Sequence, residues 1–210
     1  MKKSILTACM MLVCGVMSAQ NLSRRVTEYA EFKPAVIHLV TGKDVSTPLA
    51  NIFLKNSTLV YKSGTKTKEA FTNNLKSVEF DDRTYYRIDS VLAYRVDSVG
   101  TGQLFCARVI DMPTFRRMVL NNRQITNIQV GDQISTTSLD LIDHDQVEYP
   151  LLNYYYISYG GKTVRAHDHD VLRLTPKAKR RQFWAIVREP SFSWTNEASL
   201  KKLLKAIASD

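Results

Sequence analysis

Short apolar or alternating segments follow one another through residues 35–142, and turn-forming residues separate them. Alternation with a period of two, bounded by Gly, Asn, Asp and Ser, is typical of β-strands joined by hairpins. Asn56-Ser57, for example, stands between two such segments and predicts a hairpin turn. The predicted strands of this stretch are residues 35–40, 52–54, 59–61, 75–80, 84–88, 104–110 and 125–130.

One phrase of the sequence occurs twice, as Tyr-Arg-Ile-Asp-Ser-Val at residues 86–91 and as Tyr-Arg-Val-Asp-Ser-Val at residues 94–99. The spacing is even, so equivalent side chains of one continuous strand would face the same side of a sheet. The apolar run 104–110 is then expected to return antiparallel to residues 91–96 as a buried strand. Residues 115–120 fit either a strand or a helical turn.

The C-terminal part of the chain adds one more hairpin and then changes to helical spacing. Residues 151–159 and 163–166 flank Gly160-Gly161, which can supply the positive φ of a hairpin turn. Thr175 as N-cap and Pro176 at the first position predict a helix that runs to about residue 188, before Pro190. Its apolar side is expected to consist of Phe183, Trp184, Ile186 and Val187.

A second helix is predicted to begin after Thr195 as its N-cap. The apolar positions Leu200, Leu203, Leu204 and Ile207 form one stripe at helical spacing, with lysines off that stripe. We expect both helices to lie on the sheet, and the residues predicted to make that contact are Phe183, Ile186, Leu200, Leu203 and Ile207.

Together these patterns predict an α+β, mainly β fold: an antiparallel sheet of hairpins, as a sandwich or partial barrel, with two C-terminal helices. No low-complexity linker interrupts the pattern. We therefore expect a single β-rich domain over residues 20–210, helical from about residue 175.

The first nineteen residues have the order of a secretory signal peptide: Lys2 and Lys3, an apolar run at 5–16, and Ser18-Ala19 before Gln20. The apolar run is shorter than the roughly 20 residues that a membrane-spanning helix needs. We expect an exported protein without a transmembrane span, periplasmic or associated with the outer membrane or cell surface. The alternative is a lipoprotein processed at Cys14.

The net charge indicates which classes of partner the chain would attract, and the cysteine count decides whether an internal disulfide can form. The net charge is +9, of which the two leader lysines carry two, so the exported chain is expected to be basic and to attract anions. Export makes nucleic acid the least favoured of these, and none is expected as a partner. Cys106 would be the one cysteine of the exported chain, which excludes an internal disulfide.

A run of tyrosines in the last hairpin is the first candidate for binding. Alternation places Tyr155, Ile157 and Tyr159 on one face of the strand and Tyr154 and Tyr156 on the other. One set belongs to the core. The other is either an exposed aromatic platform for sugar rings or a peptide, or ordinary cross-strand aromatic packing.

A short histidine–aspartate cluster at residues 167–170 is the second candidate. His167 and His169, two residues apart, would point to one face of an extended segment, and imidazole and carboxylate are competent metal ligands. His144 could complete such a site if the fold brings it near. The alternative is a polar turn between the hairpin and the first helix, and no cofactor is expected.

Familiar catalytic signatures are missing from the sequence. Nucleophile-elbow, Walker and HExxH patterns do not occur, and the carboxylates are too scattered to name a general acid and base. Cys106 lies in an apolar strand without a local base, so we interpret it as a small buried hydrophobe. No catalytic residue is predicted, and a binding protein is favoured over an enzyme.

Several segments resemble small exported β-rich proteins of Bacteroidota-type Gram-negative bacteria, a group without a known activity. The segments are Asp81-Asp82 with residues 84–88, and the closing segments 154–162, 172–176 and 192–200. The resemblance implies a final β-hairpin followed by two short helices, and it carries no catalytic residue. That group O-glycosylates exported proteins at Asp-Ser or Asp-Thr followed by an apolar residue, which implies Ser90 and Ser98 as acceptor sites.

The function expected from these observations is a non-catalytic cell-envelope protein that binds a protein or glycan partner. The alternative is a metal-binding protein or metal-dependent enzyme that uses His167, His169 and His144. A third hypothesis is subunit contact through an exposed strand edge. The identity of the partner and the oligomeric state stay open.

Overall fold

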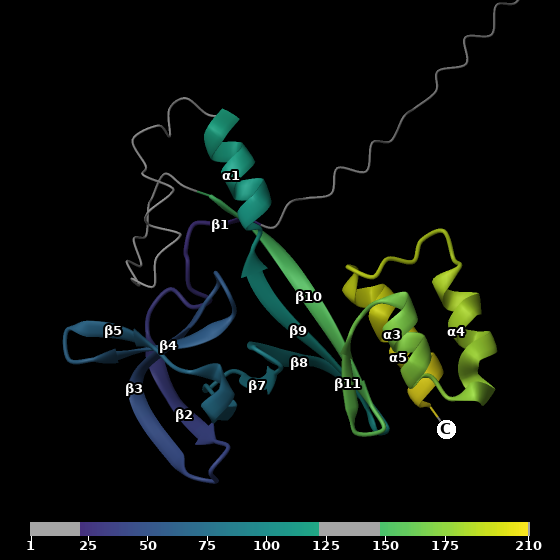
Figure 1. The fold of residues 1–210 in the computed structure, drawn as a ribbon, viewed down its shortest axis with the longest axis horizontal. Helices are drawn as coiled ribbons and strands as arrows, with labels where there is room; N and C mark the ends of the chain where they lie inside the picture. Colours follow the sequence, from purple (N-terminus) through teal and green to yellow (C-terminus); the bar gives the residue numbers. More distant parts are fainter. Residues whose placement is uncertain (1–21, 122–147, 210) are drawn as a thin grey trace, which may run out of the picture.

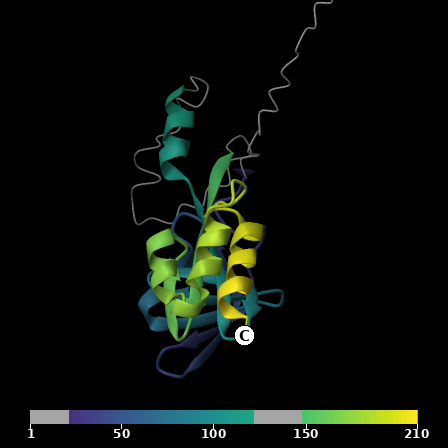
Figure 2. The same ribbon diagram turned by 90° about the vertical axis from the view of Figure 1, so that its right-hand side faces the viewer.

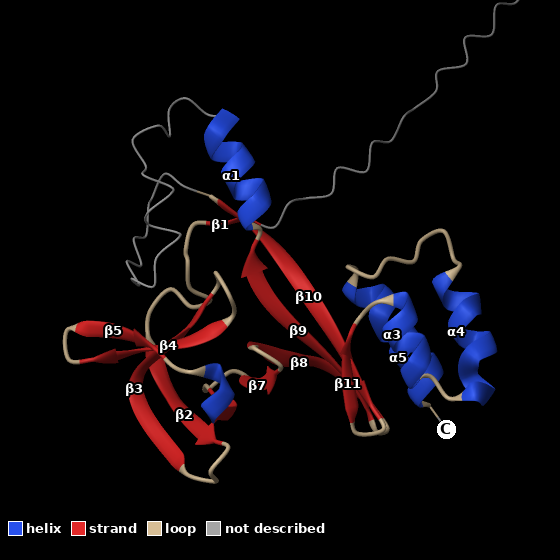
Figure 3. Cartoon of the chain, viewed as in Figure 1, coloured by secondary structure: helices blue, strands red, loops and turns tan. Residues whose placement is uncertain are grey.

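The computed structural model describes residues 22–121 and 148–209, which form a mainly β fold with helices at the C-terminal end (Figures 1 and 3). The strands make one antiparallel sheet that curls into a half-barrel, so the predicted fold class is confirmed in its partial-barrel form. The expected signal peptide, Cys14, the predicted strand 125–130 and His144 lie outside the described residues.

The described sheet has eleven strands in the order β1-β10-β9-β8-β7-β6-β2-β3-β4-β5, with β11 also paired to β10. Strands β1 and β11 pair with the two ends of β10, which is the longest strand. The bounds are β1 Leu22–Ser23, β2 Lys33–Leu39, β3 Asp44–Phe53, β4 Thr58–Ser63, β5 Lys66–Glu69, β6 Leu75–Glu79, β7 Thr84–Ile88, β8 Val91–Val99, β9 Gly102–Ile110, β10 Tyr149–Tyr159 and β11 Lys162–Arg165.

The predicted hairpins are present. Strands β3 and β4 pair around Asn56 and Ser57, and Ser57 has a φ of 53°. Strand β9 returns antiparallel to β8, and Gly160 and Gly161 turn β10 into β11 with φ values of 58° and 77°. Non-consecutive pairing of β2 with β6 closes the N-terminal hairpins into the curled sheet.

The repeated sequence does not lie in one continuous strand, so its equivalent side chains do not share a face. Asp89 and Ser90 form the turn between β7 and β8, and Asp89 has a φ of 52°. Tyr86 pairs with Ala93, which places Tyr94 on the opposite face. The turn at Asp89 and Ser90 separates the two copies into different strands, so the alternation of faces does not continue from one copy to the next.

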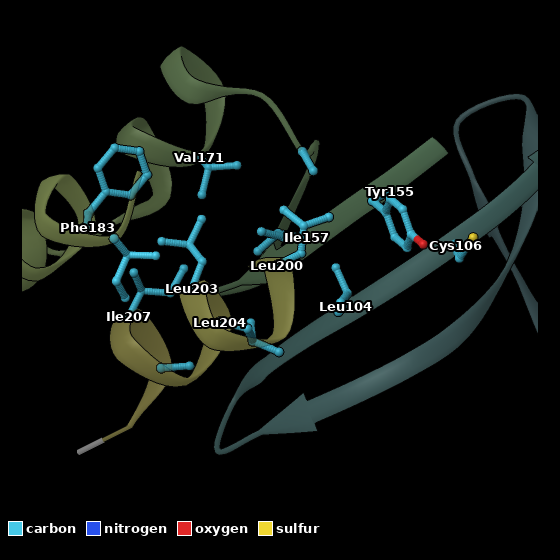
Figure 4. Packing of buried hydrophobic residues seen from close by; sticks show 13 residues of the cluster. Leu104, Cys106, Tyr155, Ile157, Val171, Phe183, Leu200, Leu203, Leu204 and Ile207 are labelled. Carbon is cyan, nitrogen blue, oxygen red and sulfur yellow. The ribbon is translucent and has the colours of Figure 1, made fainter. Parts of the chain in front are cut away.

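Two adjoining hydrophobic clusters occupy one face of the sheet, and Tyr94 contacts both. The first lies over the N-terminal hairpins and includes Ile37, Ile52 and Val78. The second lies between β9, β10 and the C-terminal helices, and Figure 4 shows its aliphatic side chains facing Leu104 and Ile157. Burial of this apolar surface holds the helices on the sheet.

Three α-helices, rather than two, follow β11 and lie beside one another (Figures 1 and 2). Helix α5 packs on β8 and β9, and α4 packs on α5. The predicted contact residues are confirmed, since Phe183, Ile186, Leu200, Leu203 and Ile207 are all buried. The helices are α1 Met112–Asn121, α3 Asp168–Leu174, α4 Arg180–Val187 and α5 Glu197–Ala208, with 3₁₀ turns at Thr72–Asn74 and Lys177–Lys179.

The predicted helix starts are corrected by one to a few residues. Thr175 ends α3 instead of beginning a helix, because the following Pro176 disfavours helical backbone at the residue before it. The Thr175 hydroxyl donates to the carbonyl of Val171 at 2.8 Å. Asn196, not Thr195, caps α5 by accepting a hydrogen bond from the Ser199 amide at 2.9 Å. Trp184 was expected in the apolar side of α4, but it is 36% exposed.

Residues 115–120, which the pattern left between strand and helix, belong to helix α1. The Thr114 amide donates to the carboxylate of Asp111 at 3.1 Å, which satisfies one free donor of the first turn. Phe115 anchors this helix by packing on Tyr149 of β10, with ring centroids 4.9 Å apart.

Candidate binding face on the sheet

Alternation along β10 separates its tyrosines between the two faces of the sheet. Tyr155 and Ile157 are buried against the helical side, whereas Tyr154 and Tyr156 lie half-buried on the opposite face. The predicted alternation is therefore confirmed. The candidate site falls on the face of β10 that α3, α4 and α5 do not cover.

Around these two tyrosines lies a patch that we call the aromatic face. Its rings come from three strands, with Tyr86 on β7, Phe105 on β9 and the two tyrosines on β10. Small and aliphatic side chains from β7, β8 and β9 fill the space beneath the rings. The aromatic face comprises Tyr86, Ile88, Val91, Ala93, Phe105, Ala107, Tyr154 and Tyr156.

Strand register places an arginine at each end of one row of this face. Arg95 pairs with Phe105, Phe105 pairs with Tyr156, and Tyr156 pairs with Arg165. Directly paired residues point to the same side of a sheet. The row therefore runs from a cation through two rings to a second cation across four strands.

The arginines lie over tyrosine rings rather than extending freely into solvent. The guanidinium of Arg165 is 4.2 Å from the ring centroid of Tyr154, and that of Arg95 is 5.9 Å from Tyr86. Tyr86 meets Phe105 edge to face at 5.7 Å. These contacts orient the rings and hold two positive charges at the border of the aromatic face.

Burial raises the pKa of Tyr156 above its usual value, and Asp89 and Tyr154 act in the same direction. The Tyr156 phenol is therefore neutral at physiological pH and able to donate a hydrogen bond. A flat ring with a polar tip, next to a cation, can contact the apolar side of a sugar ring and one of its hydroxyl or carboxylate groups.

Sequence reasoning found Tyr154 and Tyr156 but missed Tyr86, Phe105 and the two arginines. Tyr86, Arg95 and Phe105 come from strands about 50 to 70 positions away, and only the register brings them to the tyrosines. Arg165 lies in the paired strand of the same hairpin, opposite Tyr156. The sequence carries one relevant signal, the alternation of side chains within each strand. That signal shows which residues of different strands share a face only when the pairing of the strands is known.

A second cluster, on the helical side of the sheet, was also missed. The carboxylate of Glu28, whose side chain is 9% exposed, accepts from Arg108 at 3.1 Å and lies 3.5 Å from Arg83. The guanidinium of Arg83 lies 4.2 Å over the ring of Tyr94. The cluster ties the segment after β1 to β9 and to the turn before β7.

The tyrosines of this cluster are held neutral. Burial, followed by the charge of Glu28, raises the pKa of Tyr85 far above its usual range, and burial does the same for Tyr29. The Tyr29 hydroxyl donates to Asp82 at 3.0 Å, while the buried Tyr85 hydroxyl makes no hydrogen bond within the described residues. We interpret the cluster as structural, because its charges are paired with one another.

The histidine pair does not lie on an extended segment as predicted. His167 is the N-cap residue of α3, and His169 is in its first turn. Each ring faces the aspartate that follows it, at 2.8 Å for Asp168 and 3.6 Å for Asp170. The helix forms because it buries Val171, and the two histidines are exposed at its start.

The metal hypothesis itself stays a prediction, because His144 lies outside the described residues. Among residues 22–121 and 148–209, no group of three or more histidine, cysteine, aspartate or glutamate side chains could hold a metal ion. His167 instead stacks near Trp194, with ring centroids 6.5 Å apart.

Cys106 is fully buried in β9, as expected for a small hydrophobe. Burial raises the pKa of its thiol to about 11, so the thiol stays protonated at physiological pH. A protonated, buried thiol is a poor nucleophile.

Ser90 and Ser98 are both exposed, Ser90 in the β7–β8 turn and Ser98 just before the end of β8. The Ser98 amide donates to the Asp97 carboxylate at 2.8 Å. Exposure is what an acceptor site needs, and O-glycosylation of these residues stays a prediction.

Comparison with known proteins gives no guide: no family model, no curated protein and no solved structure matches this chain. Within the described part of the chain, no helix has the length and apolar character required to cross a membrane.

Proposed function

We propose that this protein is an exported, non-catalytic binding module of the cell envelope that holds a glycan on its aromatic face. The observation that carries the proposal is the cluster of half-buried tyrosines, bordered by Arg95 and Arg165, on the face of the sheet opposite the helices. No described helix contributes to that cluster.

The chemistry of the aromatic face favours a sugar carrying an acidic group. Tyrosine rings offer broad apolar area with a hydroxyl at the tip, which suits the C–H side and the hydroxyls of a sugar. Arg95 and Arg165 can each donate two parallel hydrogen bonds to a carboxylate or phosphate. A rigid sheet holds these groups in place, so little conformational entropy is lost on binding.

The alternative, a metal-binding protein or metal-dependent enzyme, has no comparable support among the described residues. It requires His167, His169 and His144 to converge, but the first two flank the start of a helix and pair with neighbouring aspartates. A melting temperature that falls in chelator, and no longer does so in a His167→Ala, His169→Ala variant, would favour this alternative instead.

The test is the double substitution Tyr154→Ala with Tyr156→Ala, measured by calorimetric titration against acidic polysaccharides of the organism's own envelope. Aromatic residues at the centre of a binding surface cost more than about 1 kcal/mol each when truncated. We therefore expect the affinity to fall at least about 30-fold, with little change in the melting temperature because both side chains are only half-buried.

The matched control is Tyr61→Ala with Phe71→Ala, which removes two aromatic rings elsewhere on the surface and should leave binding unchanged. Equal affinity of the wild type and the Tyr154, Tyr156 variant would overturn the proposal. Binding that is confined to a polypeptide of the envelope would replace the glycan with a protein partner.

A further inference from the structure

Helix α4 presents a basic face with an exposed tryptophan to solvent. Arg181, Trp184 and Arg188 follow at spacings of three and four residues, so they share one side of the helix. Arg180 and, one turn earlier, Lys177 extend the same side, and all five are exposed. We call these five residues the α4 basic face.

The tryptophan of this face is held in place although it is exposed. Phe183, the next residue toward the N-terminus, is buried and meets Trp184 edge to face at 5.2 Å. The guanidinium of Arg188 lies 5.2 Å from the Trp184 ring centroid. These two contacts hold the indole in place with 36% of its surface exposed.

Positive charge is concentrated in this part of the chain. Residues 177–209 contain eight lysines and arginines and two glutamates. Both glutamates are paired: Glu189 with Lys202 at 2.6 Å and Glu197 with Lys201 at 2.7 Å. The α4 basic face therefore keeps its four cations without an acidic partner within the described residues.

A hollow of about 550 Å³ lies between α4 and α5, and none of its lining residues belongs to the α4 basic face. Its lining combines lysines with apolar side chains. The residues that give it this character are Lys179, Lys202, Lys205, Ala185, Ile186 and Ala206.

We propose that the α4 basic face docks the protein on the surface of an anionic phospholipid bilayer. Lysine and arginine side chains are attracted to anionic headgroups, and tryptophan favours the boundary between headgroups and acyl chains. The combination of basic side chains and an exposed indole favours a bilayer, because a membrane interface accommodates both. Polysaccharide and nucleic acid can also contact arginine and aromatic side chains, so they are the competing ligands of the test.

The position of α4 fits this role. Figure 1 shows α4 on the outer side of the helical layer, with α3 and α5 between it and the sheet. The helices pack on the face of β9 and β10 opposite the aromatic face. A protein docked through α4 would therefore present the aromatic face away from the bilayer.

The experiment is co-sedimentation of the full chain with vesicles of phosphatidylethanolamine and phosphatidylglycerol, compared with vesicles of phosphatidylethanolamine and phosphatidylcholine. We expect binding to the anionic vesicles only. Arg180→Gln with Arg181→Gln should weaken it about 30-fold, because each cation near an anionic surface contributes about 1 kcal/mol. Lys66→Gln with Lys68→Gln, which makes the same charge change on the exposed strand β5, should weaken it much less.

Trp184 gives a second, independent signal. Its fluorescence should shift to shorter wavelength on binding to the anionic vesicles, and a Trp184→Phe variant, which retains Trp194, should lose that shift. Equal losses in the two glutamine variants, or an unshifted fluorescence spectrum in the bound wild type, would overturn the proposal. So would binding to heparin or to DNA that is tighter than binding to the vesicles and is lost in the Arg180, Arg181 variant, since heparin held on the aromatic face would survive that change.

Discussion

Tyr154 and Tyr155 are neighbours in the chain, but they serve opposite faces of the sheet. Tyr155 is 4% exposed and belongs to the core under the helices, while Tyr154 belongs to the aromatic face. Burial raises the pKa of Tyr155 to about 12, so its phenol stays neutral inside the core. At the residue scale, the role of each tyrosine follows from the face on which strand alternation puts it.

His38 shows how one side chain couples stability to pH. Its Nδ1 lies 2.7 Å from the Asp44 carboxylate and its Nε2 lies 3.5 Å from Glu79. The hydrogen bond with Asp44 is the main cause that raises the pKa of His38 above its usual value, with Glu79 adding to it. These contacts join β2 to β3 and to β6 through the imidazole.

A raised pKa in the folded state stabilises the protein at low pH. The contribution of His38 should be complete below its unfolded pKa of about 6.5 and should be lost as the pH rises through the folded value. We expect the wild type to lose up to about 1 kcal/mol of unfolding free energy between pH of about 5.5 and 8, relative to a His38→Asn variant. Urea unfolding at both pH values measures this difference.

The control for this prediction is His169→Asn, at an exposed histidine near the start of α3. This variant should keep the wild-type pH dependence. If His38→Asn also keeps it, the ion pairs with Asp44 and Glu79 do not contribute to stability.

At the scale of elements, close approach between α5 and the β8–β9 turn depends on a glycine. A Cβ atom added at Gly102 would lie 2.6 Å from the Cβ of Ala208 and 2.9 Å from a methyl group of Leu204. Neither the helix nor the turn can hold such contacts without moving. The absence of a side chain at Gly102 lets α5 lie directly on this end of the sheet.

We therefore expect Gly102→Ala to destabilise the protein by about 1–3 kcal/mol through overpacking. The loss should be visible as a lower denaturant midpoint with an unchanged slope in urea unfolding. Thr101→Ala, at the exposed neighbouring position, is the control and should be nearly neutral. A neutral Gly102→Ala variant would mean that α5 can shift on the sheet at little cost.

Sheet edges are a further property at this scale. Strand β5 is one edge of the described sheet, and its sequence is Lys-Thr-Lys-Glu. Charged side chains, lysine above all, disfavour pairing of an edge strand with another chain. Subunit contact through this edge is therefore less favoured than the sequence-based hypothesis allowed.

At the scale of the whole molecule, Glu28 joins parts of the chain that are distant in sequence. It lies 55 positions from Arg83 and 80 from Arg108, and its carboxylate contacts both guanidinium groups. The segment after β1 is thereby fixed against the sheet. Backbone hydrogen bonds from Glu28 to Ile52 and from Leu54 to Val26 support the same attachment.

Glu28→Gln removes the shared negative charge and leaves two arginines facing each other. We expect a loss of about 1–3 kcal/mol in unfolding free energy, because a hydrogen-bonded charge in a largely buried site is lost. The arginines are each about one-third exposed, which keeps the loss below that of a fully buried pair. Urea unfolding at neutral pH measures it.

The matched variant is Glu148→Gln, since Glu148 pairs with Arg24 at 3.4 Å and both side chains are exposed. An exposed ion pair contributes little to the free energy of unfolding, so Glu148→Gln should lower that free energy by less than about 1 kcal/mol. If the two variants lose equal stability, Glu28 is no more important than a surface ion pair.

The amino-acid sequence by itself determined most strands, the hairpins around Asn56 and Gly160, and the amphipathic stripe of α5, because alternation, turn residues and helical spacing are local signals. It also placed Tyr154 and Tyr156 on one face. It did not reveal α3, because a seven-residue helix whose one buried residue is Val171 is too short to show a helical pattern of apolar positions.

Only the tertiary structure decided which residues meet. Strand register brought Tyr86, Phe105 and Arg95 to the two tyrosines, and the packing of α4 on α5 left Trp184 exposed among arginines. Local pattern specifies the face of a side chain within its own element. Its neighbours depend on long-range pairing and burial, which are properties of the folded chain as a whole.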